Sequence, residues 1–220
     1  MITLFHGENT VLSREALREK IKGFNDQDRE IVRLYGPELS SETLVQALEA
    51  PSLFAGQRLV VVEGLLSLRP SKLKDEMVAM AANHPEIDQI LWEGKAVSAA
   101  NLKKLGKAEV KEFKIAPLVF KFLDSLSLND LHQAAKNDAV ELIFYLLHRR
   151  LAQLIQARDG GSTLRGAPWQ IGKLKSQAAK YSLAQLVALQ EKLLEIDYSI
   201  KSGQDDLPLL SQLDLVLVNF

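Results

Sequence analysis

The 220-residue sequence contains no cysteine, and its 27 basic residues nearly balance its 28 acidic ones. The absence of cysteine excludes disulfide bonds, cysteine-ligated metals and thiol nucleophiles, and it is typical of a reducing compartment. The missing charge excess leaves no strong overall field for nucleic acid or anionic lipid. No hydrophobic run approaches the roughly 20 residues of a membrane span, and the start lacks the basic region of a signal peptide. We therefore expect a soluble, cytoplasmic protein with no membrane partner.

Motifs for phosphate binding, metal binding and catalysis are missing as well. Residues 7–14, after the first predicted strand, lack the second glycine and the lysine of the P-loop G-x-x-x-x-G-K-[ST]. The four histidines have no metal-ligand spacing, and no G-x-S-x-G elbow occurs. The carboxylate pairs Asp75-Glu76 and Asp205-Asp206 are typical of caps and solvated faces. We expect no metal, no cofactor, no small-molecule substrate and no enzymatic activity.

What the sequence does contain is a globular composition, with 47% hydrophobic and 25% charged residues. In the first half, short β-branched runs alternate with amphipathic segments. This alternation predicts a mostly parallel α/β sheet with right-handed crossovers. The predicted strands are 2–6, 31–35, 59–62, 87–92 and 110–113. The predicted helices between them are 13–23, 41–50, 71–83 and 98–105, and Ser13 is the predicted cap of the first.

Beyond about residue 115 the pattern becomes helical. Helices are predicted at 118–126, 128–135, 138–160, 169–181, 182–203 and 207–218. Asp138 with Glu141, and Ser182 with Gln185, have the spacing of capping boxes. The sequence thus predicts an α/β domain over 1–115 and an all-α domain over 116–220.

One local charge imbalance lies in the helical half, where seven bases stand against the single acid Asp159. Such a cluster could face the phosphates of DNA. The pattern alone favours an ordinary solvated helix, because no aromatic ladder for base stacking accompanies the bases. The seven residues are Arg149, Arg150, Arg158, Arg165, Lys173, Lys175 and Lys180.

A second feature is the adjacent pair Leu53 and Phe54, between a predicted helix and a buried strand. From the pattern alone, the two side chains are expected to fold back on their own helix. The alternative is an exposed anchor pair for a groove on a partner, since exposed apolar clusters usually mark interfaces.

Several motifs, in the same order along the chain, resemble the delta subunit of bacterial DNA polymerase III, which acts in the clamp loader. Each motif alone is only moderately specific, and the ordered set carries the resemblance. The segment 50–62 reads Ala-Pro-Ser-Leu-Phe-Ala-Gly-Gln-Arg-Leu-Val-Val-Val. The other matching segments are 4–8, 14–17, 173–179, 181–183 and 197–203.

The resemblance implies an AAA+-like first domain without a working P-loop, followed by a small helical domain and a helical collar. It implies that Leu53 and Phe54 enter the hydrophobic groove of the sliding clamp, which reverses the expectation from the pattern alone. The chain is shorter than a typical delta subunit, with almost nothing between the last strand near Phe113 and the helices from Leu118. The small second domain is therefore expected to be missing.

The resulting hypothesis is a shortened, non-enzymatic delta-like subunit that binds and opens the sliding clamp for loading on primed DNA. Residues 116–220 would contact other clamp-loader subunits through helix faces such as Leu186, Leu193 and Ile200, where the bundle core leaves them free. DNA would be contacted indirectly or weakly.

Two alternatives remain open. The first is a small α/β nucleotide-binding regulator or enzyme with a helical dimerisation module. Its ligand would lie at the carboxyl ends of the strands, near Gly7, Gly36, Gly64 and Gly94. The second is a stand-alone DNA-binding protein that uses the basic cluster from Arg149 to Lys180.

Overall fold

The computed structural model describes residues 1–25, 30–50, 58–160, 164–204 and 207–220. The chain divides into two compact units, Met1–Lys114 and Ile115–Phe220. This division falls one residue before the boundary predicted from the sequence. Each unit has its own hydrophobic core, so the two are described separately.

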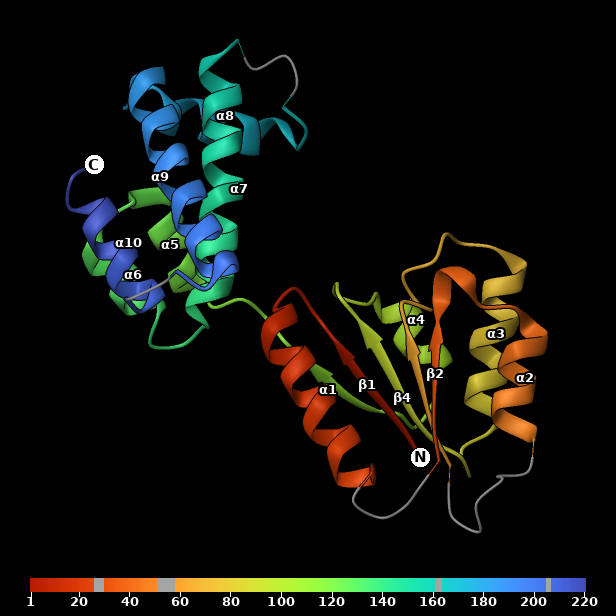
Figure 1. Cartoon of the computed structure of the whole chain (residues 1–220). Helices are drawn as coiled ribbons and strands as arrows, with labels where there is room; N and C mark the ends of the chain where they lie inside the picture. The colour runs from red at the N-terminus through yellow and green to blue at the C-terminus, as the bar shows by residue number, and fades with distance from the viewer. Residues whose placement is uncertain (26–29, 51–57, 161–163, 205–206) are drawn as a thin grey trace. The chain divides into compact units, whose positions relative to one another are not determined.

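The first unit is a five-stranded parallel sheet in the order β2-β3-β4-β1-β5 (Figure 1). The α/β parallel-sheet class predicted from the sequence is confirmed. The strands are β1 (Ile2–His6), β2 (Glu30–Tyr35), β3 (Arg58–Glu63), β4 (Asp88–Glu93) and β5 (Glu109–Glu112). The helices are α1 (Thr10–Asn25), η1 (Gly36–Glu38), α2 (Ser41–Glu49), α3 (Lys72–Asn83) and α4 (Ala99–Lys104).

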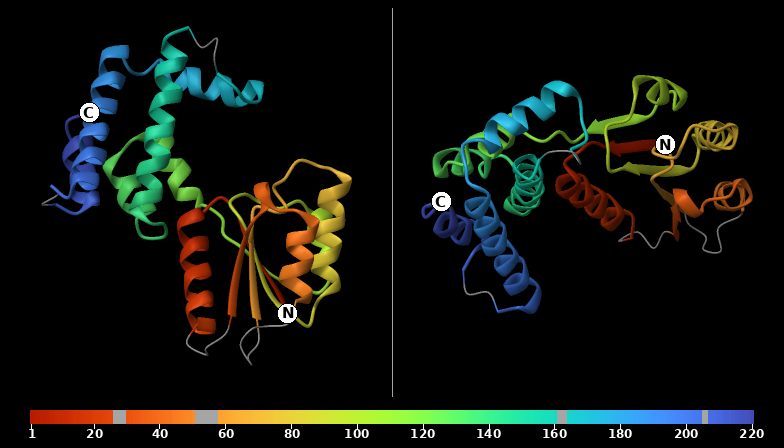
Figure 2. Two further views of the ribbon diagram at one scale, coloured as in Figure 1. Left: turned by 45° about the vertical axis from the view of Figure 1, so that its right-hand side comes forward. Right: turned by 90° about the horizontal axis from the view of Figure 1, so that it is seen from above.

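Helices cover both faces of this sheet (Figure 2). Alternate residues of a strand point to opposite faces, and β3 is buried on both. Leu59 and Val61 pack in the cluster that includes Leu17 of α1. Val60 and Val62 pack in the cluster formed with α2, α3 and α4. The continuous apolar run of β3 therefore follows from its central, doubly covered position.

The first helix begins earlier than predicted. Asn9, not Ser13, caps it, since the Asn9 Oδ1 accepts a hydrogen bond from the Leu12 amide at 3.2 Å. Ser13 lies inside the helix, where its hydroxyl accepts a hydrogen bond from the Trp92 indole at 3.1 Å. The prediction of Ser13 as the cap was wrong because Asn and Ser are both good caps, and the sequence does not choose between them.

The second unit is entirely helical in its described residues, as predicted. Its core surrounds α7, which contacts α5, α8, α9 and α10. Ile143, Leu147 and Leu151 of α7 are fully buried. None of the helices in the described ranges has the length and hydrophobicity that crossing a membrane requires. The helices are α5 (Pro117–Ser125), α6 (Leu128–Ala134), α7 (Val140–Arg158), α8 (Pro168–Ala178), α9 (Leu183–Ser202) and α10 (Leu209–Leu217).

The two predicted capping boxes have different outcomes. The box of α9 is confirmed, because Ser182 and Gln185 each accept a hydrogen bond from the other's backbone amide. The box of α7 is wrong, since this helix begins after Ala139 without a side-chain cap. The Asp138 carboxylate instead accepts a hydrogen bond from the Ala116 amide at 3.0 Å, which links the starts of α5 and α7.

Candidate partner-binding site

The predicted anchors Leu53 and Phe54 lie in segment 51–57, outside the described residues. The elements on either side of this segment are described. Helix α2 ends at Glu49, and strand β3 begins at Arg58. The α2 helix is fixed at its start by Ser40, whose hydroxyl accepts from the Thr43 amide at 3.2 Å. Its buried residues Leu44 and Leu48 hold it against the sheet.

Arg58 joins the two ends of segment 51–57. Its Nη1 donates to the carbonyl oxygens of Ala47 at 3.1 Å and Ala50 at 2.7 Å, at the C-terminal end of α2. Its Nε and Nη2 donate to the same carboxylate oxygen of Glu30, at 3.0 and 2.9 Å. Glu30 lies directly opposite Arg58 on the neighbouring strand β2. One guanidinium thus connects a helix end and two strands.

The chemistry of this contact explains why an arginine stands there. The last carbonyls of a helix have no partner within the helix and carry partial negative charge. Arginine offers five donors in a rigid fork, enough for these carbonyls and a carboxylate together. The Arg58 side chain is 8% exposed, so its charge is almost withdrawn from water. No sequence motif predicted this role of Arg58. The available signal was a single arginine at the start of an apolar strand.

The carboxyl ends of the strands, where the nucleotide-binding alternative places its ligand, are occupied by the protein's own backbone. The Gly7 amide donates to the Lys95 carbonyl at 3.2 Å, and the Asn9 amide donates to the Phe113 carbonyl at 3.0 Å. Gly7 has a φ of 131°, and a Cβ there would collide with the Phe113 carbonyl oxygen. The Gly7 and Asn9 amides, two of the backbone amides before α1, are therefore already bonded within the protein.

Two titratable groups at the same edge of the sheet bind loop amides. The Nδ1 of buried His6 accepts a hydrogen bond from the Val97 amide at 3.2 Å, and burial lowers the pKa of this histidine. Glu93 accepts from the Leu66 and Ser67 amides at 2.6 and 3.0 Å, while burial raises the pKa of its carboxyl. Both side chains hold the connections that follow the strands.

Of the two carboxylate pairs noted in the sequence, Asp75-Glu76 belongs to no group of metal-ligating side chains found among the described residues. Asp75 bonds to Lys104 at 2.7 Å, and Glu76 lies 3.7 Å from Lys72, which is the solvated pairing expected. Asp205 and Asp206 lie outside the described residues.

The basic cluster of the helical unit is not uniform. Arg150 is 15% exposed and lies 3.2 Å from Asp124, and its guanidinium also donates to Gln177 at 3.0 Å. Lys173 pairs with the other oxygen of Asp124 at 2.5 Å. These contacts join α5, α7 and α8, so two of the seven bases share one carboxylate. The remaining five are exposed: Arg149, Arg158, Arg165, Lys175 and Lys180.

The helix faces suggested for subunit contacts are largely internal. Leu186 and Leu193 are buried in the bundle core, and Ile200 is 40% exposed. Leu194 and Tyr198 of α9 are 53% and 69% exposed, so they are better placed for a contact. The exposed face of α9 could not be identified from the sequence pattern, because apolar residues occur on more than one face of this helix.

A parallel-sheet α/β unit followed by a helical unit is the fold class that these observations define. No family model and no curated protein matches the sequence. The structure is similar to the DNA clamp loader delta protein of Bacillus subtilis, with a TM-score of 0.51 and 15% sequence identity over 99% of this chain and 94% of that one. A chain from Drosophila ORC bound to poly(dA/dT) DNA and Cdc6 gives a TM-score of 0.33 and 10% identity, over 98% of this chain and 65% of that one. The likeness to the delta protein shows a shared fold.

Proposed function

We propose that this chain is a delta-like clamp-loader subunit, which binds the sliding clamp and opens it for loading on primed DNA. The observation that carries the proposal is the similarity of fold to the Bacillus subtilis DNA clamp loader delta protein over 99% of this chain. The ordered sequence motifs that resemble the delta family support it independently. We also propose a cytoplasmic location, because a bacterial clamp loader acts on DNA that is being replicated in the cytoplasm.

The proposed mechanism uses binding energy and no bond chemistry, so the protein is not an enzyme and needs no cofactor. Leu53 and Phe54 fill a groove on the clamp, and Arg58 holds the two ends of the segment that carries them. The clamp opens only as far as the subunit's affinity for the open form exceeds that for the closed form. The helical unit joins the other loader subunits, without the family's small second domain.

The test is binding of the purified protein to the sliding clamp of the same organism. Phe54→Ala should weaken binding by about 2 kcal/mol or more, because buried aromatic anchors dominate protein interfaces. Leu53→Ala/Phe54→Ala should abolish it. The matched control is Leu73→Ala/Val110→Ala, which removes two exposed apolar side chains, 49% and 43% exposed, from the same unit. Equal clamp affinity of the anchor variant and the control variant would refute the assignment.

A further inference from the structure

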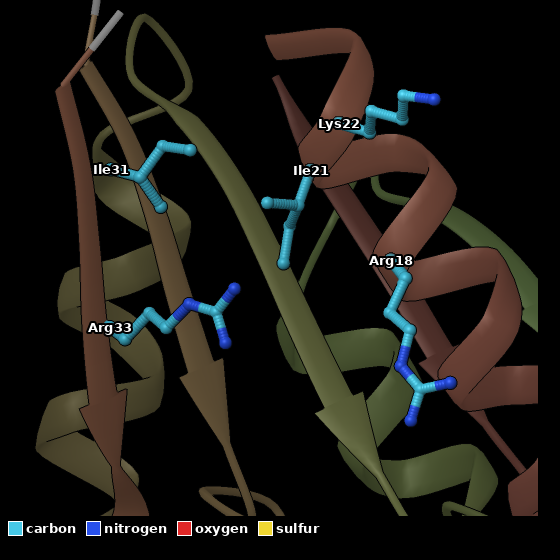
Figure 3. Close-up of a pocket in the computed structure, with 5 residues that line it drawn as sticks. All are labelled: Arg18, Ile21, Lys22, Ile31 and Arg33. Carbon is cyan, nitrogen blue, oxygen red and sulfur yellow. The ribbon is translucent and has the colours of Figure 1, made fainter. Parts of the chain in front are cut away.

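A basic pocket of about 510 Å³ lies in the α/β unit between α1 and β2 (Figure 3). Ile31 of β2 packs with the α1 cluster on this face of the sheet, whereas Arg58 bonds to α2, which packs with the other face. The pocket is therefore on the opposite face of the sheet from the contacts by which Arg58 holds the end of α2. Its lining residues are Arg18, Ile21, Lys22, Ile31 and Arg33.

The basic side chains of this pocket are not paired with acidic side chains among the residues that the structure describes. Arg18, Lys22 and Arg33 are exposed, and none of them enters an ion pair or side-chain hydrogen bond with another described residue. Arg14, one turn earlier in α1, differs in this respect. It lies 2.6 Å from Glu63 and stacks 3.5 Å above the centre of the Trp92 ring. Within the described ranges, Arg14 is therefore neutralised by Glu63, whereas the pocket arginines Arg18 and Arg33 are not neutralised.

The base of the pocket is apolar. Ile21 is 8% exposed, and Ile31 is partly buried in the same cluster. Figure 3 shows the two isoleucines pointing toward each other, with Arg33 extending from β2 toward α1 and Lys22 pointing outward. A ligand that fits here needs an apolar group against the two isoleucines, with anionic groups next to it for the two guanidinium groups.

An acidic peptide with an apolar side chain meets both requirements. Guanidinium groups bind carboxylates in a bidentate, charge-assisted manner. Single-stranded nucleic acid fits less well, because such binding uses aromatic side chains as stacking platforms, and none lines this pocket. Strand β2 is at the edge of the described sheet, so an extended segment can approach it.

We propose that this pocket binds an acidic segment of a partner protein. The Asp or Glu carboxylates of the segment pair with Arg18 and Arg33, and an apolar side chain packs on Ile21 and Ile31. The proposal goes beyond the clamp-loader function and does not rest on it.

The experiment measures the fluorescence anisotropy of a short labelled peptide of Asp, Glu and Leu, titrated with the full chain. Arg18→Glu/Arg33→Glu should weaken binding about tenfold or more, because two attractive contacts become repulsive. Arg18→Lys/Arg33→Lys keeps both positive charges but removes the bidentate guanidinium groups. It should therefore weaken peptide binding less than the charge reversal does. Lys103→Glu/Lys107→Glu makes the same charge change elsewhere in the unit and should change affinity less than about twofold. Circular dichroism checks that each variant is folded.

Further probes separate the possible ligands. A peptide with Asn and Gln in place of the acids should not bind, and one with Ser in place of Leu should bind more weakly. Leu53→Ala/Phe54→Ala should leave peptide binding unchanged, which keeps this test independent of clamp binding. Failure of the wild-type chain to bind the acidic peptide overturns the proposal, as does an equal loss in the Lys103/Lys107 control.

Two other outcomes would identify a different ligand for the pocket. Binding of a labelled oligo(dT), lost in the Arg18/Arg33 reversal while the peptide does not bind, would make the pocket a phosphate site. Concentration-dependent dimerisation, lost in the same variant on analytical ultracentrifugation, would make the ligand a second copy of this chain. Either result overturns the proposal of an acidic partner segment.

Discussion

At the scale of single residues, His148 links α7 to α9. Its ring lies edge-on to Phe144 with centroids 4.6 Å apart, and its Nδ1 is 3.0 Å from the Gln190 side-chain amide. Burial lowers the pKa of His148 below 6.5, and the nearby Asp197 opposes this shift only partly. The neutral ring is therefore the form that the folded helical unit accommodates.

This shift makes the stability of the helical unit depend on pH. The native pKa lies below the 6.5 of the unfolded chain, so the unfolded state binds more protons between the two values. The free energy of unfolding should therefore fall as the pH drops through 6.5 toward the native pKa. Histidine-ring NMR signals give the native pKa directly, and urea unfolding at a series of pH values gives the stability.

His148→Phe is the variant that isolates this effect. It should lower stability at neutral pH, since Gln190 loses its partner, but it should also flatten the decline below pH 6.5. The pKa of His6 in the α/β unit is likewise lowered by burial, and its contribution should persist in this variant. An unchanged pH dependence after the substitution would contradict the role of His148. The burial of the four histidines could not be predicted from sequence, because it depends on packing between elements that are distant along the chain.

At the scale of elements, Arg58 determines how the end of α2 meets the sheet. Arg58→Met should destabilise the α/β unit by about 3 kcal/mol, because Glu30 and two helix carbonyls lose the buried guanidinium that bonds to them. Arg58→Lys should cost less, since it keeps the charge and loses the fork. The measurement is the free energy of unfolding in urea.

Arg33→Met is the matched control, since Arg33 lies on the neighbouring strand and is exposed. It should change stability by no more than about 0.5 kcal/mol. Glu30→Leu/Arg58→Met removes both charges and should recover part of the loss. If Arg58→Met costs no more than Arg33→Met, Arg58 does not hold these elements together.

The existence and type of these elements could be predicted from periodicity, whereas their exact starts could not. Short β-branched or apolar runs, several of them ending at turn residues, indicated each strand of the sheet. The caps were less certain, because a capping side chain can serve another element, as Asp138 does for Ala116. Arg58 escaped prediction for a similar reason. Its partners Ala47 and Glu30 are brought together by the parallel crossover, which no local pattern records.

At the scale of the whole molecule, no buried cluster of the described residues includes residues of both units: two lie on the faces of the sheet and one in the helical unit. The candidate anchors could be proposed only from a resemblance, since their pattern alone favoured packing on their own helix. The basic pocket was not predicted at all. Its three bases are spread over α1 and β2, and they come together only when the helix packs on the sheet.

This separation of the buried clusters predicts that the two units respond separately to core substitutions. Leu147→Ala, at a fully buried position of α7, should cost about 2–5 kcal/mol through lost burial and a residual cavity. Hydrogen exchange should then show faster exchange across 115–220 and unchanged protection in β3. Leu59 of β3 is equally buried. Leu59→Ala should give faster exchange across 1–114 and unchanged protection in α7. If both variants accelerate exchange in both units to the same extent, the chain opens as one cooperative unit, and the assignment of clamp binding and subunit assembly to separate halves loses its physical basis.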